Sequence, residues 1–404
     1  MGSCSKTRVL EDNSMGPENN IRVGLEVSSV FETFGGGVGY STAHLAIELQ
    51  KILGQEGITF FSSLGKVREI PADGPFSSTP LHPGWKSHRA YRHLYREFLL
   101  PGQIKGSGVE VVHFPDSKVP RRMKNTGVAI AVTINDMGAY VGKVPEEHGE
   151  RHRNAMKNAV SAADMVITIS DFTRNSLIEI LDVDPGKIKT IYLGISDRYK
   201  PIEEETWRPV LKSLWGIQEG YFLFIGEVNE RKNLLALTRA HKSLPADFRK
   251  RHPLVIAGRV DETVSKSRAA FLTHFLSDID EFIILTGMVS EEEKLFLYNG
   301  CSAMVFPSKY EGFGLPVLEA MACGRAVIAV RSSAVAELHQ DKALMLEQTA
   351  PEELGRAMTR IVDDDDLREN LEKKGKKHAA VFTWEKAARN TIEAYRDALT
   401  WSSS

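Results

Sequence analysis

The segment Pro307–Val330 reads PSKYEGFGLPVLEAMACGRAVIAV and is the most informative stretch of this 404-residue chain. Its pattern predicts the end of a strand, a loop, a short helix and a second strand. Pro316 suits the first turn of that helix, where its missing N–H costs nothing. Gly324 suits the position just past the helix end, where a left-handed backbone is common. Such a strand–helix–strand unit is typical of a parallel sheet covered by helices.

The same alternation extends over the chain and starts twice. The strands predicted in the first half are residues 21–27, 108–114, 127–134 and 163–170. After a polar stretch, the strands predicted in the second half are residues 221–228, 253–258, 282–287, 302–307 and 326–330. Two such series predict an α/β protein with two Rossmann-like domains, whose ligand lies at the carboxyl ends of the strands.

These patterns divide the chain into four parts. Residues 1–20 are polar and patternless, which predicts a disordered leader. The N-terminal domain is placed at residues 21–205 and the C-terminal domain at 206–385. The last part, 386–404, is predicted to be an amphipathic helix that packs back toward the N-terminal domain.

Composition narrows the class of protein. Lys plus Arg total 51 and Asp plus Glu 53, a balance that argues against a nucleic-acid partner. The three cysteines, Cys4, Cys301 and Cys323, form no CxxC pair, which favours a reducing compartment over a disulfide framework or a zinc site. No apolar run approaches the ~18 residues of a membrane span. We therefore expect a cytoplasmic protein, with peripheral contact at the inner face of the membrane left open.

Two glutamates in the quoted segment are candidates for binding a ligand with hydroxyl groups. Glu319 falls in the first turns of the predicted helix, and Glu311 stands in the loop before it, next to GFG. Glycines let a ligand approach the backbone, and the N–H groups of a helix N-terminus can receive phosphate or sugar oxygens. A structural alternative is that Glu319 only favours the helix dipole and Glu311 is a solvated loop charge.

With its surroundings, FPS-x-YEGFGLPVLEAMACG, this pair resembles the signature of the retaining glycosyltransferases of family 4, whose hallmark is two glutamates separated by seven residues. The resemblance covers roughly residues 21–399. It implies a GT-B fold, in which an acceptor-side domain and a nucleotide-sugar-binding domain face a central cleft. It also implies a hexosyltransferase, and a mannosyltransferase-like enzyme is one form that this activity could take. Such an enzyme moves a sugar from a GDP- or UDP-sugar to a saccharide, lipid-linked or small-molecule hydroxyl with retention, and needs no metal or cofactor.

The resemblance also assigns roles to residues of the C-terminal domain. Glu311 would act at the sugar as a catalytic residue, and Glu319 would accept the ribose hydroxyls. Val289, in the strand-turn 285–290, would lie near the base, which is held mainly by main chain. The other donor-binding residues on the glutamate loop are Gly312, Phe313, Gly314 and Leu315.

Two neighbouring cations follow the strand at 221–228. Asn229 is a candidate cap for the next helix, which would place Arg231 and Lys232 in its first turn, where cations oppose the helix dipole. This placement suggests an anionic ligand such as a diphosphate; two solvated surface charges are the alternative. The resemblance favours the diphosphate, because RKN is the family's usual donor-phosphate motif. Many members carry a further Arg where this chain has Glu227, and we expect Arg231 to take over that role.

Two loops of the N-terminal domain complete the predicted site. The loop FGGGVGY lacks the G-x-G-x-x-G spacing, which disfavours an NAD-dependent oxidoreductase. The resemblance implies that Gly36 and Gly37 bring the backbone close to the donor diphosphate, with a purely conformational turn as the alternative. It also makes Asn135 and Asp136 catalytic candidates, with Asn135 where many relatives have histidine. An Asn can hydrogen-bond a sugar hydroxyl but cannot act as acid or base. Asp136 is an acceptor-side carboxylate or a structural turn residue.

Two other functions stay open. A GT-B sugar-nucleotide epimerase or hydrolase would share the donor clamp but need a general base, which Asn135 does not supply. A catalytically degenerate protein could bind a nucleotide-sugar as a scaffold or sensor, and the departures at Asn135 and Glu227 keep this alternative.

A basic segment, residues 82–105, carries five Lys or Arg against one acid. Its apolar side chains fall on one predicted helical face and comprise Tyr91, Leu94, Tyr95 and Phe98. Its arginines fall on another face and comprise Arg89, Arg92 and Arg96. The first interpretation is a core-packing helix with a solvated basic face. The second is a surface for an anionic membrane or a lipid-diphosphate acceptor.

Overall fold

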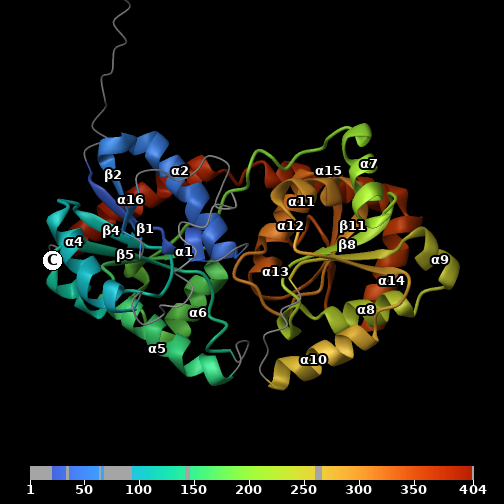
Figure 1. Cartoon of the computed structure of the whole chain (residues 1–404), viewed down its shortest axis with the longest axis horizontal. Coiled ribbons are helices and arrows are strands. Elements are labelled where there is room, and N and C mark those ends of the chain that lie inside the picture. The colour runs from blue at the N-terminus through green and yellow to red at the C-terminus, as the bar shows by residue number, and fades with distance from the viewer. Residues whose placement is uncertain are drawn as a thin grey trace, which may run out of the picture.

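The computed structural model describes residues 21–32, 36–62, 65–67, 93–141, 146–259 and 266–402. Figure 1 shows two lobes side by side, each built around one sheet with helices on both faces. The predicted α/β architecture with two Rossmann-like domains is confirmed. The leader predicted at residues 1–20 lies outside the described ranges.

The first domain contains a seven-stranded sheet in the order β3-β2-β1-β4-β5-β6-β7. Its strands are β1 (Val23–Glu26), β2 (Ile58–Ser62), β3 (Gly65–Val67), β4 (Val111–Phe114), β5 (Ala129–Ile134), β6 (Met165–Thr168) and β7 (Ile188–Thr190). The hairpin strand β3 runs antiparallel to β2, and the other pairs are parallel. The α-helices of this domain are α1 (Ser28–Glu32), α2 (Gly37–Gly57), α4 (Leu100–Gly106), α5 (Glu146–Ala162) and α6 (Asp171–Leu181). Its shorter helical turns are η3 (Tyr95–Leu99), η4 (Arg121–Asn125) and η5 (Pro185–Lys187).

The second domain contains a six-stranded parallel sheet in the order β10-β9-β8-β11-β12-β13. Its strands are β8 (Tyr221–Ile225), β9 (Leu254–Ala257), β10 (Ile283–Gly287), β11 (Cys301–Phe306), β12 (Ala326–Val330) and β13 (Leu344–Leu346). Its helices are α7 (Glu204–Trp215), η6 (Glu230–Lys232), α8 (Leu234–Lys242), α9 (Ala246–Arg251), α10 (Lys266–Ser277), α11 (Glu291–Gly300), α12 (Leu315–Ala322), α13 (Ser333–His339), α14 (Pro351–Asp363) and α15 (Asp365–Ala379).

The last helix, α16 (Trp384–Ser402), returns to the first domain. In Figure 1 it lies in the left lobe, beside α2. Trp384, Ile392 and Tyr395 are buried in one hydrophobic cluster with strands and helix α2 of the first domain. The apolar side of this amphipathic helix therefore packs into the hydrophobic core of the first domain.

The strand order explains where ligands can bind. In each sheet the order reverses beside the first strand of the domain, between β1 and β4 and between β8 and β11. Loops at the carboxyl ends of two such strands diverge and leave a crevice, the usual ligand position in doubly wound sheets. The loop after β8 and the loop after β11 hold several of the residues singled out from the sequence.

The basic segment departs from the prediction. Residues 82–92, including Tyr91, lie outside the described ranges. Tyr95 is buried, as a core-packing helix requires, but Leu94 and Phe98 are exposed. Leu94 and Phe98 lie four residues apart and are exposed together, so the apolar side chains around the π-helix Tyr95–Leu99 do not share one buried face.

Candidate active site

Glu311 lies at the centre of a buried ion cluster. Its Oε1 is 2.6 Å from the Lys232 Nζ, and its Oε2 is 3.1 Å from Nη1 of Arg231. The Arg231 guanidinium also donates to the carbonyl oxygen of Tyr310, at 2.8 Å. The backbone N–H of Glu311 donates to Oγ of Ser333, at 2.7 Å. The carboxylate is therefore held in one place by contacts from both loops.

Lys232 and Glu311 are 79 residues apart but meet because they follow neighbouring strands, β8 and β11. Asn229 caps a 3₁₀ turn, η6, by accepting from the N–H of Lys232 at 3.1 Å. Asn233 then adopts a left-handed backbone, with φ of 56°, before α8 begins. The prediction that the two cations occupy the first turn of a helix is thus corrected, because the capped turn ends before that helix. Because α8 begins only after Asn233, Arg231 and Lys232 lie outside its first turn and do not oppose its dipole there.

Burial and charge oppose each other at this cluster. Burial disfavours the charged form of Glu311, but Lys232 and Arg231 together outweigh it and lower the pKa of that carboxyl. Burial lowers the pKa of the Lys232 ammonium, while Glu311 beside it acts in the other direction. The Lys232 Nζ also lies 5.1 Å from the centre of the Phe306 ring. The arrangement places a carboxylate between two cations in a space that holds little water.

Glu319 lies on α12 and is also buried. Its Oε2 accepts from the Tyr298 hydroxyl, at 2.7 Å. Burial raises the pKa of Glu319; Lys294 opposes this, and Glu291 adds to it. The two glutamates of the signature thus differ, because Glu311 contacts cations directly and Glu319 is hydrogen-bonded to a tyrosine.

The rest of the glutamate loop serves close packing. Gly314 caps α12 with φ of 97°, a conformation that favours glycine. Phe313 is buried, and its ring lies 6.0 Å from that of Phe382. Leu315 is half-buried in the same core, as is Val289, which follows β10. The Phe313 side chain packs inward and leaves its backbone groups to a ligand, whereas the Val289 side chain is only partly buried.

Asn135 and Asp136 bring the first domain into contact with this loop. A Cβ placed at Gly312 would lie 2.0 Å from the carbonyl oxygen of Asn135 and 3.1 Å from the Cβ of Asp136. The N–H of Met137 donates to the Tyr310 hydroxyl, at 3.0 Å. Because a side chain cannot fit there, Gly312 is what allows the two domains to touch at this point.

The Asn135 and Asp136 side chains are used locally. Nδ2 of Asn135 donates to the carbonyl oxygen of Pro115, at 3.0 Å, and Oδ1 of Asp136 accepts from the N–H of Gly138, at 2.8 Å. The Asp136 charge also contributes to raising the pKa of Arg231, where burial, the largest influence, acts in the opposite direction. The structure therefore brings Asp136 near the cation cluster, with the backbone of both residues at the domain contact.

Gly36 and Gly37 stand at the start of α2. Gly36 is the N-cap residue, and its carbonyl oxygen accepts from the N–H of Tyr40, at 3.1 Å. Gly37 is exposed, and a Cβ placed on it would meet nothing within 4 Å. The backbone at this turn is therefore open to a ligand.

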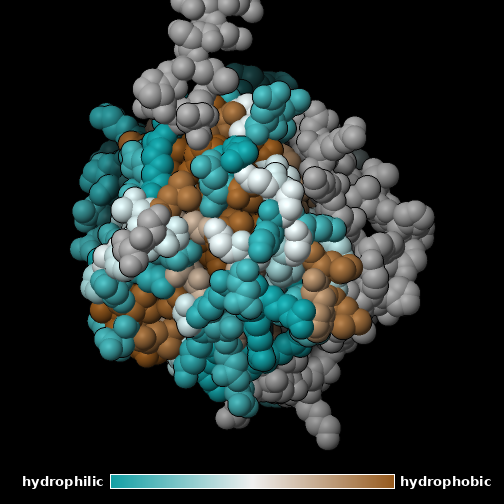
Figure 2. Space-filling view, turned by 90° about the vertical axis from the view of Figure 1, so that its left-hand side faces the viewer, coloured by the Kyte–Doolittle hydropathy of each residue, from teal (hydrophilic) through white to brown (hydrophobic). Residues whose placement is uncertain are grey.

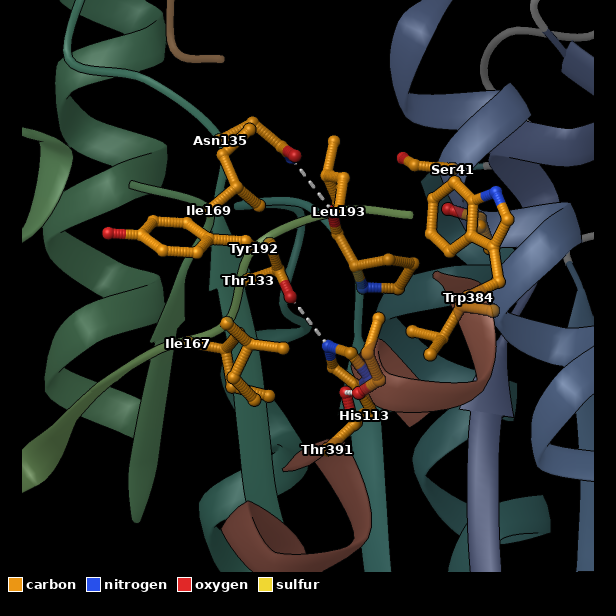
Figure 3. Close-up of a pocket in the computed structure, with 15 residues that line it drawn as sticks. Ser41, His113, Thr133, Asn135, Ile167, Ile169, Tyr192, Leu193, Trp384 and Thr391 are labelled. Atoms are coloured by element: carbon orange, nitrogen blue, oxygen red, sulfur yellow. Dashed lines mark hydrogen bonds between the residues drawn. The ribbon is translucent and has the colours of Figure 1, made fainter. Parts of the chain in front are cut away.

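A pocket that the sequence did not indicate lies beside Asn135 in the first domain (Figure 3). Helix α16 contributes Trp384 and Thr391 to its wall, and strand β4 contributes His113. His113 is fully buried between Thr133, at 2.7 Å, and the Tyr395 hydroxyl, at 2.9 Å. Burial lowers the pKa of His113 to about 3, so its imidazole is neutral. A free volume of about 30 Å³ leaves room for little more than water.

The structure brings together Arg231, Lys232 and Glu311, and sets Asp136 close to them. It places Glu319 in a separate polar cluster with Tyr298. Sequence reasoning missed the tyrosines and Lys294 in that cluster, because nothing in their local pattern distinguishes them from core or surface residues. It also missed Ser333, whose hydroxyl fixes the Glu311 backbone.

The comparisons agree with this geometry. The family model described as "Glycosyltransferase Family 4" matches residues 35–199, and the one described as "Glycosyl transferases group 1" matches residues 212–378. The two matches correspond to the first and second domains. The chain belongs to the GT-B glycosyltransferases. In this glycosyltransferase both loops of the ion cluster fall within the second match.

Curated relatives of this glycosyltransferase include sugar transferases of several kinds. It is 28% identical to O-antigen chain mannosyltransferase B of Escherichia coli over 71% of this chain and 74% of that protein. It is 24% identical to a D-inositol 3-phosphate glycosyltransferase of Nocardioides sp. over 76% of this chain and 68% of that protein. A match to the serotype-specific mannosyltransferase WbdA of Escherichia coli, at 28% identity, covers 58% of this chain but only 29% of that longer protein.

Solved structures share the fold of this glycosyltransferase. HepE of Anabaena, in complex with UDP and glucose, matches with a TM-score of 0.68 at 14% identity over 92% of this chain and 98% of that one. Sucrose-phosphate synthase of Thermosynechococcus elongatus matches with a TM-score of 0.71 at 20% identity over 93% and 98%.

Two further findings concern the described part of the chain. None of its helices is both long enough and apolar enough to cross a membrane. Within the same ranges, no three His, Cys, Asp or Glu side chains gather as a set that could hold a metal ion.

Proposed function

We propose that this glycosyltransferase moves a hexosyl group from a GDP- or UDP-sugar to a hydroxyl of a saccharide, lipid-linked or small-molecule acceptor. The transfer retains the anomeric configuration and needs no metal ion. The observation that carries the proposal is the buried cluster of Arg231, Lys232 and Glu311 at the point where the second sheet reverses its strand order.

Arg231 and Lys232 bind the donor diphosphate. Arginine offers a planar fork of donors and lysine a compact charge, so the pair suits a group with several oxygens. As the bond between the sugar C1 and the phosphate oxygen breaks, negative charge grows on the leaving diphosphate. Fixed cations in a dry site stabilise that charge without reorganisation. The lowered pKa of Glu311 supports a carboxylate that is charged at neutral pH, and its contact with Lys232 favours the ammonium form of that lysine against the effect of burial.

The second domain holds the rest of the donor. Glu319 accepts hydroxyls of the ribose, and the backbone near Val289 meets the base. Backbone N–H groups of Gly312–Leu315 face the phosphate and the sugar, and Glu311 orients the sugar. Support comes from the position of Glu319 on α12, directly after this loop, and from the left-handed Gly314 that starts the helix.

The first domain supplies backbone, amide and carboxylate contacts. Gly36 and Gly37 let the backbone of α2 approach the diphosphate, as the open space at Gly37 permits. Asn135 places the sugar, and Asp136 faces the acceptor. Because an amide cannot take a proton, the acceptor hydroxyl passes its proton to the departing phosphate oxygen. The new bond from C1 to the acceptor oxygen then forms on the face that the phosphate leaves, which gives retention.

The relatives support a mannosyl donor as the more specific form of the proposal. Two of the named relatives are mannosyltransferases. HepE is solved with UDP and glucose, which keeps a UDP-sugar as the other form.

We also propose peripheral contact with an anionic membrane through the exposed side chains of η3. Leu94, Phe98 and Leu99 are each more than half exposed, and the Arg122 guanidinium lies 4.3 Å from the centre of the Phe98 ring. Figure 2, which faces the outer side of the first domain, shows hydrophobic areas set among hydrophilic ones. Exposed apolar side chains next to cations suit an anionic lipid surface. Sedimentation with anionic phospholipid vesicles tests this, and equal recovery of a Leu94→Ser/Phe98→Ser variant would contradict it.

The donor is tested by thermal stability against GDP-, UDP-, ADP- and dTDP-sugars without added metal. A ligand that binds the folded state raises its melting temperature. We expect a rise with GDP- or UDP-sugars that the Glu319→Gln variant loses and the Glu292→Gln variant, changed at an exposed glutamate of α11, keeps. Binding without any sugar transfer would instead support a degenerate nucleotide-sugar-binding protein. No binding to any of the four would refute the proposal.

A further inference from the structure

One lysine in the polar cluster around Glu319 has no role in the function proposed above. Lys294 lies on α11, and its Nζ is 2.5 Å from Oε1 of Glu291. The Lys294 side chain is only 16% exposed, which is unusual for a lysine. Its Nζ lies 5.5 Å from the centre of the Tyr40 ring and 5.8 Å from that of Tyr199. The ammonium group therefore points into the protein, toward the first domain, and not into solvent.

The cluster around Lys294 draws on both domains. Tyr298 donates to Glu319 at 2.7 Å, and Tyr199 donates to Glu291 at 2.6 Å. The titratable and charged groups facing Glu319 and Lys294 are Glu291 and Tyr298 of α11, Cys323 after α12, Tyr40 and His44 of α2, and Arg198 and Tyr199 of the segment between the domains. Arg198 is exposed, so Lys294 is the cation on the buried side of this set.

Two carboxylates in one buried space require a counter-charge. Like charges that share a site raise the pKa of one partner, and burial adds to the effect. Burial raises the pKa of Glu319, Lys294 offsets part of this rise, and Glu291 adds to it. Without the lysine, the hydroxyls of Tyr298 and Tyr199 would still bond Glu319 and Glu291, but the remaining cation would be the exposed Arg198.

A simpler interpretation is an ordinary pair between residues three apart in α11, which stabilises helices slightly. Two observations go beyond it. The charge of Glu319 raises the pKa of Lys294 more than the charge of Glu291 does, against the opposing and larger influence of burial. The Nζ also lies over an aromatic ring of the other domain, a contact that a surface pair in α11 does not need.

We propose that Lys294 is a positioning residue for donor binding, which keeps Glu319 in its carboxylate form so that it can accept both ribose hydroxyls. This inference rests on the donor site proposed above. The contact with Tyr40 adds that the first domain, through α2, helps to hold the lysine in place.

The test is calorimetric binding of the nucleoside diphosphate that the thermal screen selects, and of its 2′-deoxy form, from about pH 5 to about pH 9, a range above the ordinary carboxyl pKa. The two ligands differ only in the 2′-hydroxyl, so the ratio of their affinities measures the contact made by that hydroxyl. Titration of the phosphate affects both ligands equally and cancels in the ratio. A hydroxyl bonded to a charged group is worth about 10- to 100-fold. We expect wild type to keep this preference for the ribose form down to a lower pH than the Lys294→Met variant does. Lys294→Arg should restore the wild-type profile.

A substitution of Glu291 tests whether the pH range of the discrimination ratio shifts in the expected direction. Glu291→Gln removes the like charge and should extend the discrimination to lower pH, and Glu291→Gln/Lys294→Met should return toward wild type. If Lys294→Met does not fold, Glu291→Gln alone decides. A discrimination ratio with the same pH profile in wild type and in these variants would overturn the role of Lys294. Failure of wild type to bind any nucleotide would instead overturn the donor site itself, and the inference with it.

Discussion

The two sides of the site differ in charge. On the second domain, Arg231, Lys232 and Glu311 contact one another as ions. On the first domain, the pocket beside Asn135 is lined mainly by apolar side chains, and its polar groups are an amide, hydroxyls and the neutral imidazole of His113. Both sides lie at the carboxyl ends of similar parallel sheets, so the fold does not cause the difference. The second domain thus offers buried cations, whereas this pocket of the first domain offers uncharged groups and room for little more than water.

The largest effect should come from removing charge on the second domain. Lys232→Met deletes the cation that we propose stabilises the leaving diphosphate, and we expect the turnover number to fall about 100- to 1,000-fold. The measurement is the initial rate of sugar transfer at saturating donor. Lys309→Met, changed at an exposed lysine of the neighbouring loop, should keep wild-type turnover. Equal rates in wild type and Lys232→Met would remove the basis of the comparison.

One glycine of each domain, Gly312 of the second and Gly37 of the first, can be changed to test the contact between the domains. Gly312→Ala forces a methyl group against the Asn135 carbonyl, and overpacking of this kind costs about 1–3 kcal/mol of unfolding free energy. We expect loss of transfer together with a lower denaturation midpoint. Gly37→Ala meets open space, so its stability should stay within about 0.5 kcal/mol of wild type.

These two variants separate packing from ligand approach. If Gly37→Ala weakens donor binding without loss of stability, the backbone at α2 contacts the donor. An unchanged donor affinity would leave the turn a conformational role only. A Cβ at Gly312 would lie 2.0 Å from the Asn135 carbonyl oxygen. A Gly312→Ala protein as stable as wild type would therefore show that the two domains can move apart here without loss of stability.

The smallest effect should come from the neutral side. Tyr395→Phe removes the hydroxyl that bonds Nδ1 of buried His113, which should cost about 1 kcal/mol of unfolding free energy. Because that imidazole is neutral and lies within the core, turnover should stay within about twofold of wild type, equivalent to less than about 0.5 kcal/mol. Urea denaturation and initial rates measure the two quantities. A tenfold loss of rate would make His113 part of the reaction.

The sequence predicted the two Rossmann-like domains because buried parallel strands read as short apolar runs. It did not locate β2, β3, β7 or β13, and all of these except the five-residue β2 are three residues long and too short to form a pattern. The approach of Arg231 and Lys232 to Glu311 follows from motifs that lie at the ends of neighbouring strands. Their 3₁₀ turn could not be foreseen, since it depends on the left-handed backbone of Asn233.

The cluster around Lys294 could not be read from sequence at all. In EEEK the lysine looks like one of several solvated charges at a helix start. Only the packing of α11 against the segment holding Tyr199, and the approach of Tyr40 from the other domain, bury its charge. A long-range juxtaposition of this kind leaves no periodic signal.

The return of α16 to the first domain has a consequence for biosynthesis. Trp384, Ile392 and Tyr395 of α16 belong to a hydrophobic cluster whose buried members outside this helix all lie in the first half of the chain. A ribosome that has made only that half has produced a sheet whose apolar face is covered by α2 but not by α16. The first domain therefore cannot finish folding until the last helix emerges from the exit tunnel. The domain that is translated first is completed last, and exposed apolar surface at that stage is a target for chaperones.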